Sequence, residues 1–253
     1  MKYAFAGDRQ IGCNILKYLI EQGYEPSALL VSRGKNESHA ETLRQISNLP
    51  EEYIFSGNSF KEKENIQKLN DLSIDYIIGI HFPYIIPTEV LSIPKIGFLN
   101  LHPAYLPYNK GWHTPSWAIL EGTPYGATLH FMSEDLDEGD IIHQKELQVD
   151  TDDTANSLYQ KVLTLEEEVF KEALEDLVSL KPKKSKQTHA GTSHIKKDLE
   201  KVKELKLEEK YTAREILDKI RALTTNKDSE LAFFVEDGKK VGVRVEFILL
   251  EEN

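Results

Sequence analysis

Asn100 and His102 lie two residues apart, and their side-chain types are suited to acyl transfer. Both belong to the apolar stretch FLNLH, and His102 directly precedes Pro103. Side chains two apart in a strand point the same way, so both are expected to face one site. An imidazole is a general base near neutral pH, and an amide N–H can donate to a developing oxyanion. The pair therefore suits acyl transfer to an amine, in which the amine is the nucleophile.

A plain structural interpretation also exists, in which the two polar side chains satisfy their hydrogen bonds at a strand end. The residues that follow favour a site instead. LHPAYLP contains two prolines, which restrict the backbone after His102, and SEDLDEGD brings a cluster of carboxylates after a further apolar stretch. One of these carboxylates is a candidate for orienting the imidazole.

The elements that would position this pair alternate between strand and helix patterns. Strands are expected in KYAFAGD, PSALLVS, YIFSG, DYIIGIHF and IGFLNLHP, with helical periodicity between them, as in RQIGCNILKYLIEQG. This alternation predicts parallel strands in an α/β sheet. Asn100 and His102 then lie at the carboxyl end of a strand, where open α/β sheets bind ligands.

The pattern changes in the second half of the chain. GATLHFM and DIIHQKELQV predict two more strands, residues 154–180 a long helix, and LKPKKSKQTHAGTSH a polar linker. The tail predicts the helix TAREILDKIRALT and a β-hairpin that turns at Asp237-Gly238. We therefore expect an N-terminal catalytic domain, residues 1–185, with a mostly parallel Rossmann-like sheet. A small C-terminal α+β domain, residues 186–253, is expected to follow.

Composition argues against several classes of protein. A net charge of −11 disfavours nucleic-acid binding through a broad basic surface. The one cysteine, Cys13, excludes an intramolecular disulfide and is typical of a reducing compartment. MKYAFAGD does not resemble a signal peptide, and no apolar run reaches the length of a membrane span. A cytoplasmic protein without membrane or nucleic-acid partners is expected.

Two cofactor classes are also disfavoured. GDRQIG stands where dinucleotide-binding proteins carry GxGxxG, but Arg9 takes the place of the second glycine. The histidines at 102, 113, 130 and 143 lack the spacing of metal ligands, so no metal is expected.

Three blocks, NLHPAYLPYNKG, GATLHFM and LDEGDII, resemble the folate-dependent formyltransferases. The family motif, Asn-x-His-Pro and a later Asp in a Leu-Asp-x-Gly loop, falls on Asn100, His102 and Asp137. The resemblance implies 10-formyltetrahydrofolate as the formyl donor. It implies that His102 deprotonates the acceptor amine, that Asn100 stabilises the oxyanion, and that Asp137 holds His102 or a water and assists proton transfer to the folate nitrogen. Folate contacts are implied at Ile80, Phe82, Asp135 and Asp137, with core packing as the alternative for Ile80 and Phe82.

KGWHTPSWAI and EGTPYGATLHF are similar to nucleotide-sugar N-formyltransferases. That similarity implies a dTDP-linked amino-dideoxyhexose as acceptor, such as dTDP-4-amino-4,6-dideoxyglucose, for a surface polysaccharide such as an O-antigen. The amine position, the sugar configuration and the base stay open. Expected acceptor-side residues are Arg9, Arg33, Tyr105, Lys110, Trp112 and His113. Surface ion pairing is the alternative for the two arginines, and core packing is the alternative for the tryptophan.

The tail also resembles the reduced tail of sugar formyltransferases, which implies a homodimer interface. Packing of VRVEFILL on its own domain is the alternative. A methionyl-tRNA formyltransferase and a non-catalytic folate- or nucleotide-binding protein are the alternative functions.

Overall fold

A computed structural model describes residues 1–135 and 137–250 of the 253-residue chain. The chain packs as two compact units. The first unit comprises Met1–His102, Thr128–Gln144 and Glu166–Thr188, and the second Pro103–Ala127, Lys145–Leu165 and the chain from His189 onward. Since each unit draws on three segments, the division into domains at residues 185–186 stays a prediction.

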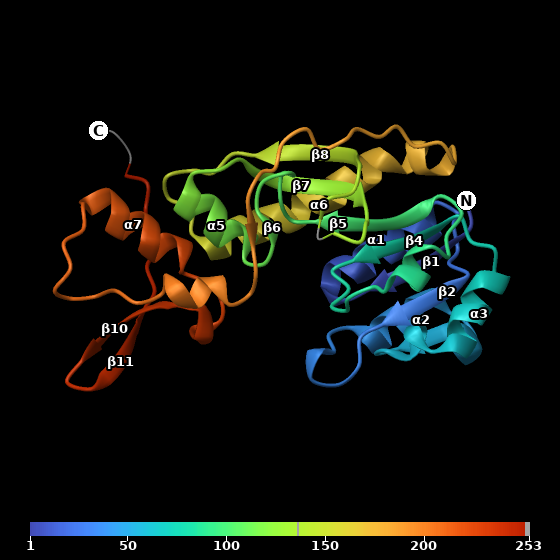
Figure 1. Ribbon diagram of the computed structural model, residues 1–253, viewed down its shortest axis with the longest axis horizontal. Helices are drawn as coiled ribbons and strands as arrows, with labels where there is room; N and C mark the ends of the chain where they lie inside the picture. The colour runs from blue at the N-terminus through green and yellow to red at the C-terminus, as the bar shows by residue number, and fades with distance from the viewer. Residues whose placement is uncertain (136, 251–253) are drawn as a thin grey trace. The chain divides into compact units, whose positions relative to one another are not determined.

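A seven-stranded sheet runs in the order β3-β2-β1-β4-β5-β7-β8 (Figure 1). Strands β1 to β5 pair in parallel, and β7 pairs with β5 in the antiparallel sense. The predicted mostly parallel α/β fold is thus confirmed. The strands are β1 (Tyr3–Gly7), β2 (Ala28–Val31), β3 (Ile54–Ser56), β4 (Tyr76–Ile80), β5 (Gly97–His102), β7 (Tyr125–Phe131) and β8 (Ile141–Leu147).

Most helices follow the predicted segments, but α4 and α5 were not expected. The helices are α1 (Arg9–Glu21), α2 (Ala40–Ser47), α3 (Lys63–Asp71), α4 (Thr88–Leu91), α5 (Thr114–Glu121), α6 (Ala155–Val178) and α7 (Ala213–Ala222). Short 3-10 turns cover Gly34–Asn36, Glu51–Tyr53, Ser59–Lys61, Asp198–Lys201 and Asp228–Glu230. Among the helices of the described residues, none is both long and apolar enough to cross a lipid bilayer.

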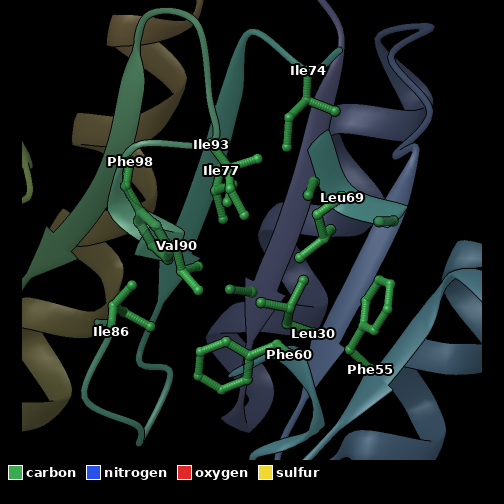
Figure 2. Packing of buried hydrophobic residues seen from close by; sticks show 13 residues of the cluster. Leu30, Phe55, Phe60, Leu69, Ile74, Ile77, Ile86, Val90, Ile93 and Phe98 are labelled. Carbon is green, nitrogen blue, oxygen red and sulfur yellow. The ribbon is translucent and has the colours of Figure 1, made fainter. Parts of the chain in front are cut away.

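An apolar cluster packs on one side of the sheet in the first unit (Figure 2). Leu30 and Ile77 project from β2 and β4, and both side chains are fully buried. Phe60 and Leu69 cover them from the segment around α3. Full burial of such side chains contributes about 1.5–3 kcal/mol each, so this cluster stabilises the strands whose carboxyl ends carry the site.

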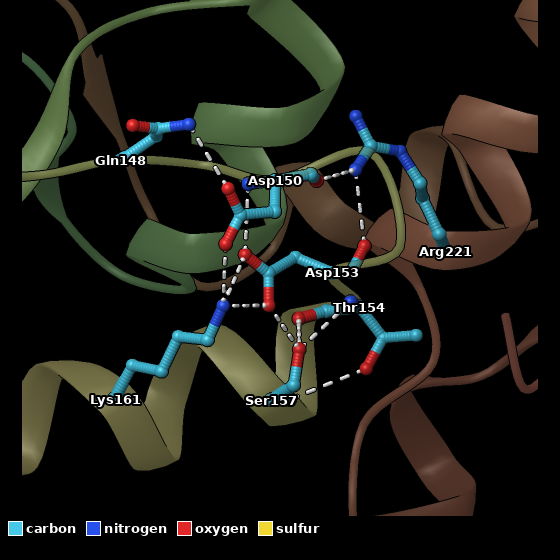
Figure 3. Close-up of polar contacts among 7 residues, drawn as sticks. All are labelled: Gln148, Asp150, Asp153, Thr154, Ser157, Lys161 and Arg221. Atoms are coloured by element: carbon cyan, nitrogen blue, oxygen red, sulfur yellow. Dashed lines mark hydrogen bonds and ion pairs between the residues drawn. The ribbon is translucent and has the colours of Figure 1, made fainter. Parts of the chain in front are cut away.

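The second unit is held by a polar network at the start of α6 (Figure 3). The Asp153 side chain, 3% exposed, accepts hydrogen bonds from Ser157 Oγ at 2.7 Å and from Lys161 Nζ at 2.9 Å. Arg221 of α7 donates to the backbone carbonyls of Asp150 and Asp153, at 3.0 Å each. The network therefore fixes α7 to the loop that begins α6.

The predicted hairpin is confirmed in the second unit. Strands β10 (Ala232–Glu236) and β11 (Lys239–Val243) pair in the antiparallel sense, and Asp237 and Gly238 take the φ values of 48° and 72° that a tight hairpin turn requires. The strand expected over VRVEFILL, however, ends at Val243. Val245 N–H donates to Thr224 Oγ1 at 3.2 Å instead of joining a ladder. The side chains that follow are largely exposed at Ile248, Leu249 and Leu250.

The segment expected to be a polar linker is where the chain passes from the first unit to the second, between Thr188 and His189. It is also bonded on each side of that point. In the first unit, Ser185 and Ile141 exchange two backbone hydrogen bonds of 2.8 Å. In the second unit, Lys110 N–H donates to Thr192 O at 2.9 Å, and β6 (Lys110–Gly111) pairs with β9 (Ser193–His194). The polar composition of the segment does not predict these bonds, because they use backbone groups rather than apolar side chains.

Candidate active site

Strand β5 places Asn100 and His102 on one face at its carboxyl end, as the two-residue spacing predicts. The neighbouring residue on β4 is Gly79, in register with Asn100. A Cβ atom built at Gly79 would lie 2.8 Å from Leu99 O and 3.9 Å from Asn100 Oδ1. The glycine therefore allows close strand packing beside the asparagine amide.

His130 of β7 lies directly opposite Asn100. Its Nδ1 is 2.8 Å from Phe131 O, and its Nε2 is 3.3 Å from Asn100 Nδ2. Because a carbonyl oxygen only accepts, the Nδ1 atom carries the proton and Nε2 accepts from the Asn100 amide. The acceptor Nε2 of His130 therefore favours the orientation in which the Asn100 side chain presents its Nδ2 nitrogen, and not its oxygen, to the His130 ring.

His130 is 1% exposed, and this burial dominates its titration. Burial lowers the pKa of the imidazole to about 4, and the nearby His102 lowers it too, whereas Asp137 and the bond to Phe131 O act to raise it. The ring is therefore neutral at physiological pH, which keeps Nε2 an acceptor.

Asp137 brings a carboxylate to the same place from the loop after β7. Its Oδ2 lies 3.6 Å from His102 Nε2, and its Oδ1 lies 3.5 Å from Asn100 Nδ2 and 3.6 Å from His130 Nε2. The side chains of His102 and Asp137 are each 8% exposed. The arrangement combines a general base, an orienting carboxylate and an oxyanion donor, which is what acyl transfer to an amine needs.

The expected folate contacts lie on the loops around this group. Ile80 is fully buried, and its carbonyl accepts Asp8 N–H at 3.1 Å. Phe82 is half-buried, with its ring centroid 5.5 Å from that of Phe60. Asp135 is exposed, and its carbonyl accepts from Ser133 Oγ at 3.0 Å. The core role proposed as an alternative fits the Ile80 side chain, and the folate contacts stay predictions.

Arg9 follows β1 and lies beside a buried acid–histidine pair. Its Nη1 is 3.5 Å from Nδ1 of His81, which follows β4. His81 Nε2 lies 2.9 Å from both carboxylate oxygens of Glu166 on α6. Arg33 is exposed at the end of β2, where its backbone N–H donates to Tyr84 Oη at 3.0 Å. Both arginines thus lie at the carboxyl ends of strands, where a ligand is expected.

The other acceptor-side candidates belong to the second unit. Lys110 is 1% exposed and donates to Ala190 O at 2.9 Å. Trp112 is 51% exposed, with Lys196 Nζ 5.3 Å from its ring centroid. Tyr105 is half-buried. Their roles in acceptor binding stay predictions.

His113 begins α5 with a left-handed φ of 58°. Its Nδ1 lies 3.8 Å from Glu230 Oε1. Burial lowers the pKa of His113, and Lys227 and Lys196 lower it further against the opposing effect of Glu230.

Three residues of the first-unit site were not expected from the sequence: His130, His81 and Glu166. The register of GATLHFM beside FLNLH is the signal for His130, since an antiparallel neighbour places it against Asn100. Glu166 is distant in sequence and gives no such signal. Among the described residues, no three His, Cys, Asp or Glu side chains are grouped as a bound metal ion requires.

The comparisons with known proteins agree with this geometry. The family described as "Formyl transferase" matches residues 26–174, and the chain belongs to this family. A second family, "N-formyltransferase dimerization C-terminal domain", matches residues 198–249. The match to the catalytic family includes β5, β7 and the loop that carries Asp137.

Relatives of two kinds are similar to the chain. The dTDP-4-amino-4,6-dideoxyglucose formyltransferase of Mycobacterium bovis is 31% identical over 172 residues, which cover 68% of this chain and 72% of that protein. The methionyl-tRNA formyltransferase of Clostridioides difficile is 32% identical over 183 residues, covering 69% of this chain and 58% of that protein. The match therefore spans less than two thirds of the tRNA enzyme.

Among solved structures, a 4-N formyltransferase from Francisella tularensis superposes with a TM-score of 0.82 at 26% identity. The superposition covers 98% of each chain. The similarity therefore extends through both compact units and includes the tail.

Proposed function

We propose that the protein is an N-formyltransferase that moves a formyl group from 10-formyltetrahydrofolate to the amine of a dTDP-linked amino-dideoxyhexose. The gathering of Asn100, His102 and Asp137 at the end of β5 carries this proposal. That chemistry needs a base for the amine and a donor for the oxyanion, and these three side chains supply both.

The proposed reaction balances with these groups alone. The acceptor nitrogen attacks the formyl carbon, a new C–N bond forms, and Asn100 Nδ2–H donates to the oxyanion. His102 takes the proton that the amine loses, and Asp137 stabilises the imidazolium so formed. The bond from the formyl carbon to the folate nitrogen then breaks, and that nitrogen takes up the proton that His102 had accepted, which Asp137 assists, as tetrahydrofolate leaves and His102 becomes neutral again.

Two observations support a nucleotide sugar over a tRNA as acceptor. The chain and the Francisella 4-N formyltransferase cover one another over 98% of their lengths, and residues 198–249 match the family described as the N-formyltransferase dimerization C-terminal domain. The net charge of −11 also opposes the phosphate neutralisation that tRNA binding requires. We favour dTDP-4-amino-4,6-dideoxyglucose as the acceptor, because the Mycobacterium bovis relative is named for it. The product would serve a surface polysaccharide such as an O-antigen.

We further propose that the protein is a homodimer that uses its tail. The matched dimerization family covers residues 198–249. Within the second unit, apolar side chains of this region and of the residue after it are 40–88% exposed at Leu217, Val235, Val241, Ile248, Leu249 and Leu250. The last three are consecutive in sequence, and an exposed apolar patch marks an interaction surface. Analytical ultracentrifugation is expected to give the mass of two chains, and Ile248→Asp is expected to give a monomer.

A formyl-transfer assay tests the activity. The protein is incubated with 10-formyltetrahydrofolate and, separately, dTDP-4-amino-4,6-dideoxyglucose, its 3-amino isomer, a UDP-4-amino sugar and methionyl-tRNA. Mass spectrometry then detects the addition of one formyl group. Formylation of the dTDP-4-amino sugar is the expected result. Formylation of methionyl-tRNA alone would replace the proposed acceptor, and folate binding without any transfer would favour a non-catalytic binding protein.

A further inference from the structure

The loop that carries Asp137 has an uncommon backbone conformation. Asp137 takes a φ of 54°, in the left-handed region that only a few per cent of residues other than glycine adopt, aspartate more often than most. Two residues on, Gly139 packs so tightly that a Cβ atom there would lie 1.8 Å from Phe131 O. The position of the Asp137 carboxylate thus depends on a turn that needs support from outside the loop.

Gln187 supplies that support from far along the chain. Its Nε2 donates to Asp137 O at 2.7 Å and to Gly139 O at 3.0 Å. The backbone that carries it is anchored two residues earlier, where Ser185 and Ile141 exchange hydrogen bonds of 2.8 Å. One side-chain amide therefore spans the turn and ties both of its ends to a fixed segment of the same unit.

The side-chain amide of Gln187 can donate both of these hydrogen bonds at the same time. A primary amide nitrogen has two N–H groups, and two carbonyl oxygens face it here, so each can receive one. A carboxylate of the same shape has no N–H to give. The other end of the group, Oε1, is buried and has no hydrogen-bond partner within residues 1–135 and 137–250. A buried acceptor without a partner costs free energy, which offsets part of the stability that the two donated bonds contribute.

We propose that Gln187 is a positioning residue for the catalytic group, which acts by holding the Asp137 turn. The inference rests on the proposed function. With the turn held, Asp137 Oδ2 lies 3.6 Å from His102 Nε2 and Oδ1 3.5 Å from Asn100 Nδ2. Loss of the two bonds frees the turn to move, and the carboxylate leaves both partners. The amine acceptor does not contact Gln187 in this role, so acceptor binding is expected to be unchanged, whereas the folate is expected to contact the turn itself at Asp135 and Asp137.

The test compares Gln187→Ala and Gln187→Glu with Lys186→Ala, which changes an exposed neighbour. Both Gln187 variants are expected to lower kcat about 10- to 100-fold, the scale of a small misplacement of a catalytic group. KM for the amine acceptor is expected to change less than about threefold, because the change affects positioning rather than acceptor binding. KM for the folate does not enter the comparison, since the predicted folate contacts Asp135 and Asp137 lie on the same turn. Lys186→Ala is expected to match the unchanged protein.

A spectroscopic measurement separates positioning from general damage. The imidazole ¹⁵N resonances of His102 and His130 report the hydrogen bonds made by each ring. In both Gln187 variants they are expected to move toward their positions in Asp137→Asn. A purely structural role would lower the folded fraction and leave the resonances of folded molecules in place. Unmoved resonances, or a kcat within twofold of the unchanged protein in both variants, would overturn the inference.

The two proposals fail in different ways. If the unchanged protein transfers no formyl group to any acceptor, the proposed function fails, and the ¹⁵N resonances still decide whether Gln187 places Asp137. Should Gln187→Ala not fold, the nearly isosteric Gln187→Glu gives the same comparison.

Discussion

Glu166 of α6, fully buried, lies with both carboxylate oxygens 2.9 Å from Nε2 of His81 at the end of β4. The bond ties helix α6 to the strand edge that carries Arg9 and the loop with the predicted folate contact Phe82. His81 adopts a φ of 51°, in the left-handed region of the backbone map, at the point where the chain leaves β4.

Glu166→Ala is therefore expected to destabilise the protein by about 2–3 kcal/mol, the upper part of the range for a buried group that is left without its hydrogen-bond partner. Glu167→Ala is the matched control, since Glu167 is the next residue and accepts hydrogen bonds only from exposed side chains, Asn14 at 2.6 Å and Lys171 at 3.3 Å, among the described contacts. Its expected cost is about 1 kcal/mol. Urea unfolding measures the free energy of unfolding of both variants. Equal losses would contradict the prediction that the Glu166–His81 bond contributes more stability than the exposed contacts of Glu167.

Removal of the base or of the oxyanion donor is expected to abolish most turnover. His102→Asn should lower kcat by about 10²–10⁴-fold, and Asn100→Ala by about 10²–10³-fold. Binding of the nucleotide sugar, measured by calorimetry, should survive in both. His143→Asn is the control, because His143 pairs with Glu172 at a half-exposed position. Near-normal turnover in either site variant would remove its proposed role.

Acid stability is expected to depend on His130. Its folded-state pKa of about 4 lies below the ordinary value of 6.5, so the unfolded chain binds a proton that the folded protein does not. Stability therefore falls as pH drops from 6.5 toward 4, by up to about 1.4 kcal/mol per pH unit. His130→Gln should give a shallower slope in urea unfolding across this window. The two curves should run parallel above pH 7, and a slope unchanged by the substitution would contradict the account.

The network of Figure 3 makes a different prediction. Burial acts to raise the pKa of Asp153, but hydrogen bonds from Lys161, Ser157 and the backbone of Asp150 outweigh it and lower the pKa. Asp153 thus contributes stability above its unfolded pKa of about 3.8, and that contribution is lost as pH falls below this value.

Lys161→Met is expected to cost about 1.5–3 kcal/mol at pH 7, the value of a hydrogen bond to a charged group. The difference in stability between the variant and the unchanged protein should be smaller at pH 3. Asp153 becomes protonated in the variant there, and a protonated carboxyl no longer needs the charge of Lys161. Lys17→Met is the control, since Lys17 and Glu21 form an exposed pair worth about 0.5 kcal/mol or less. Thermal unfolding at the two pH values measures both, and a difference that widens in acid would contradict the prediction.

Much of the fold was predictable because its signals are local. Apolar runs such as DYIIGIHF are buried on both faces of a parallel sheet, and they gave strand positions close to those observed. The pairing of Asn100 with His102 followed from the strand period alone. Asp137 was found through the family motif rather than through spacing, because a loop can return to the sheet from any distance.

Other features could not be read from the sequence, for physical reasons. His130 depends on strand order, which places β7 beside β5. Gln187 and Glu166 depend on contacts between distant segments, and a polar side chain in a polar segment gives no periodic signal. The strand predicted over VRVEFILL was wrong for the opposite reason, because there a periodic signal is present without a strand. VRVEFILL alternates like a strand, but pairing also requires a neighbour, and Val245 bonds to a threonine side chain instead.

The bond from Gln187 to Asp137 also has a consequence for synthesis on the ribosome. Asn100, His102, His130 and Asp137 have all been added once the loop after β7 is made. The amide that holds the turn arrives fifty residues later, after α6. A nascent chain therefore contains every group of the candidate catalytic site well before it can hold them in place. Activity during translation should therefore rise about 10- to 100-fold once residue 187 has left the exit tunnel.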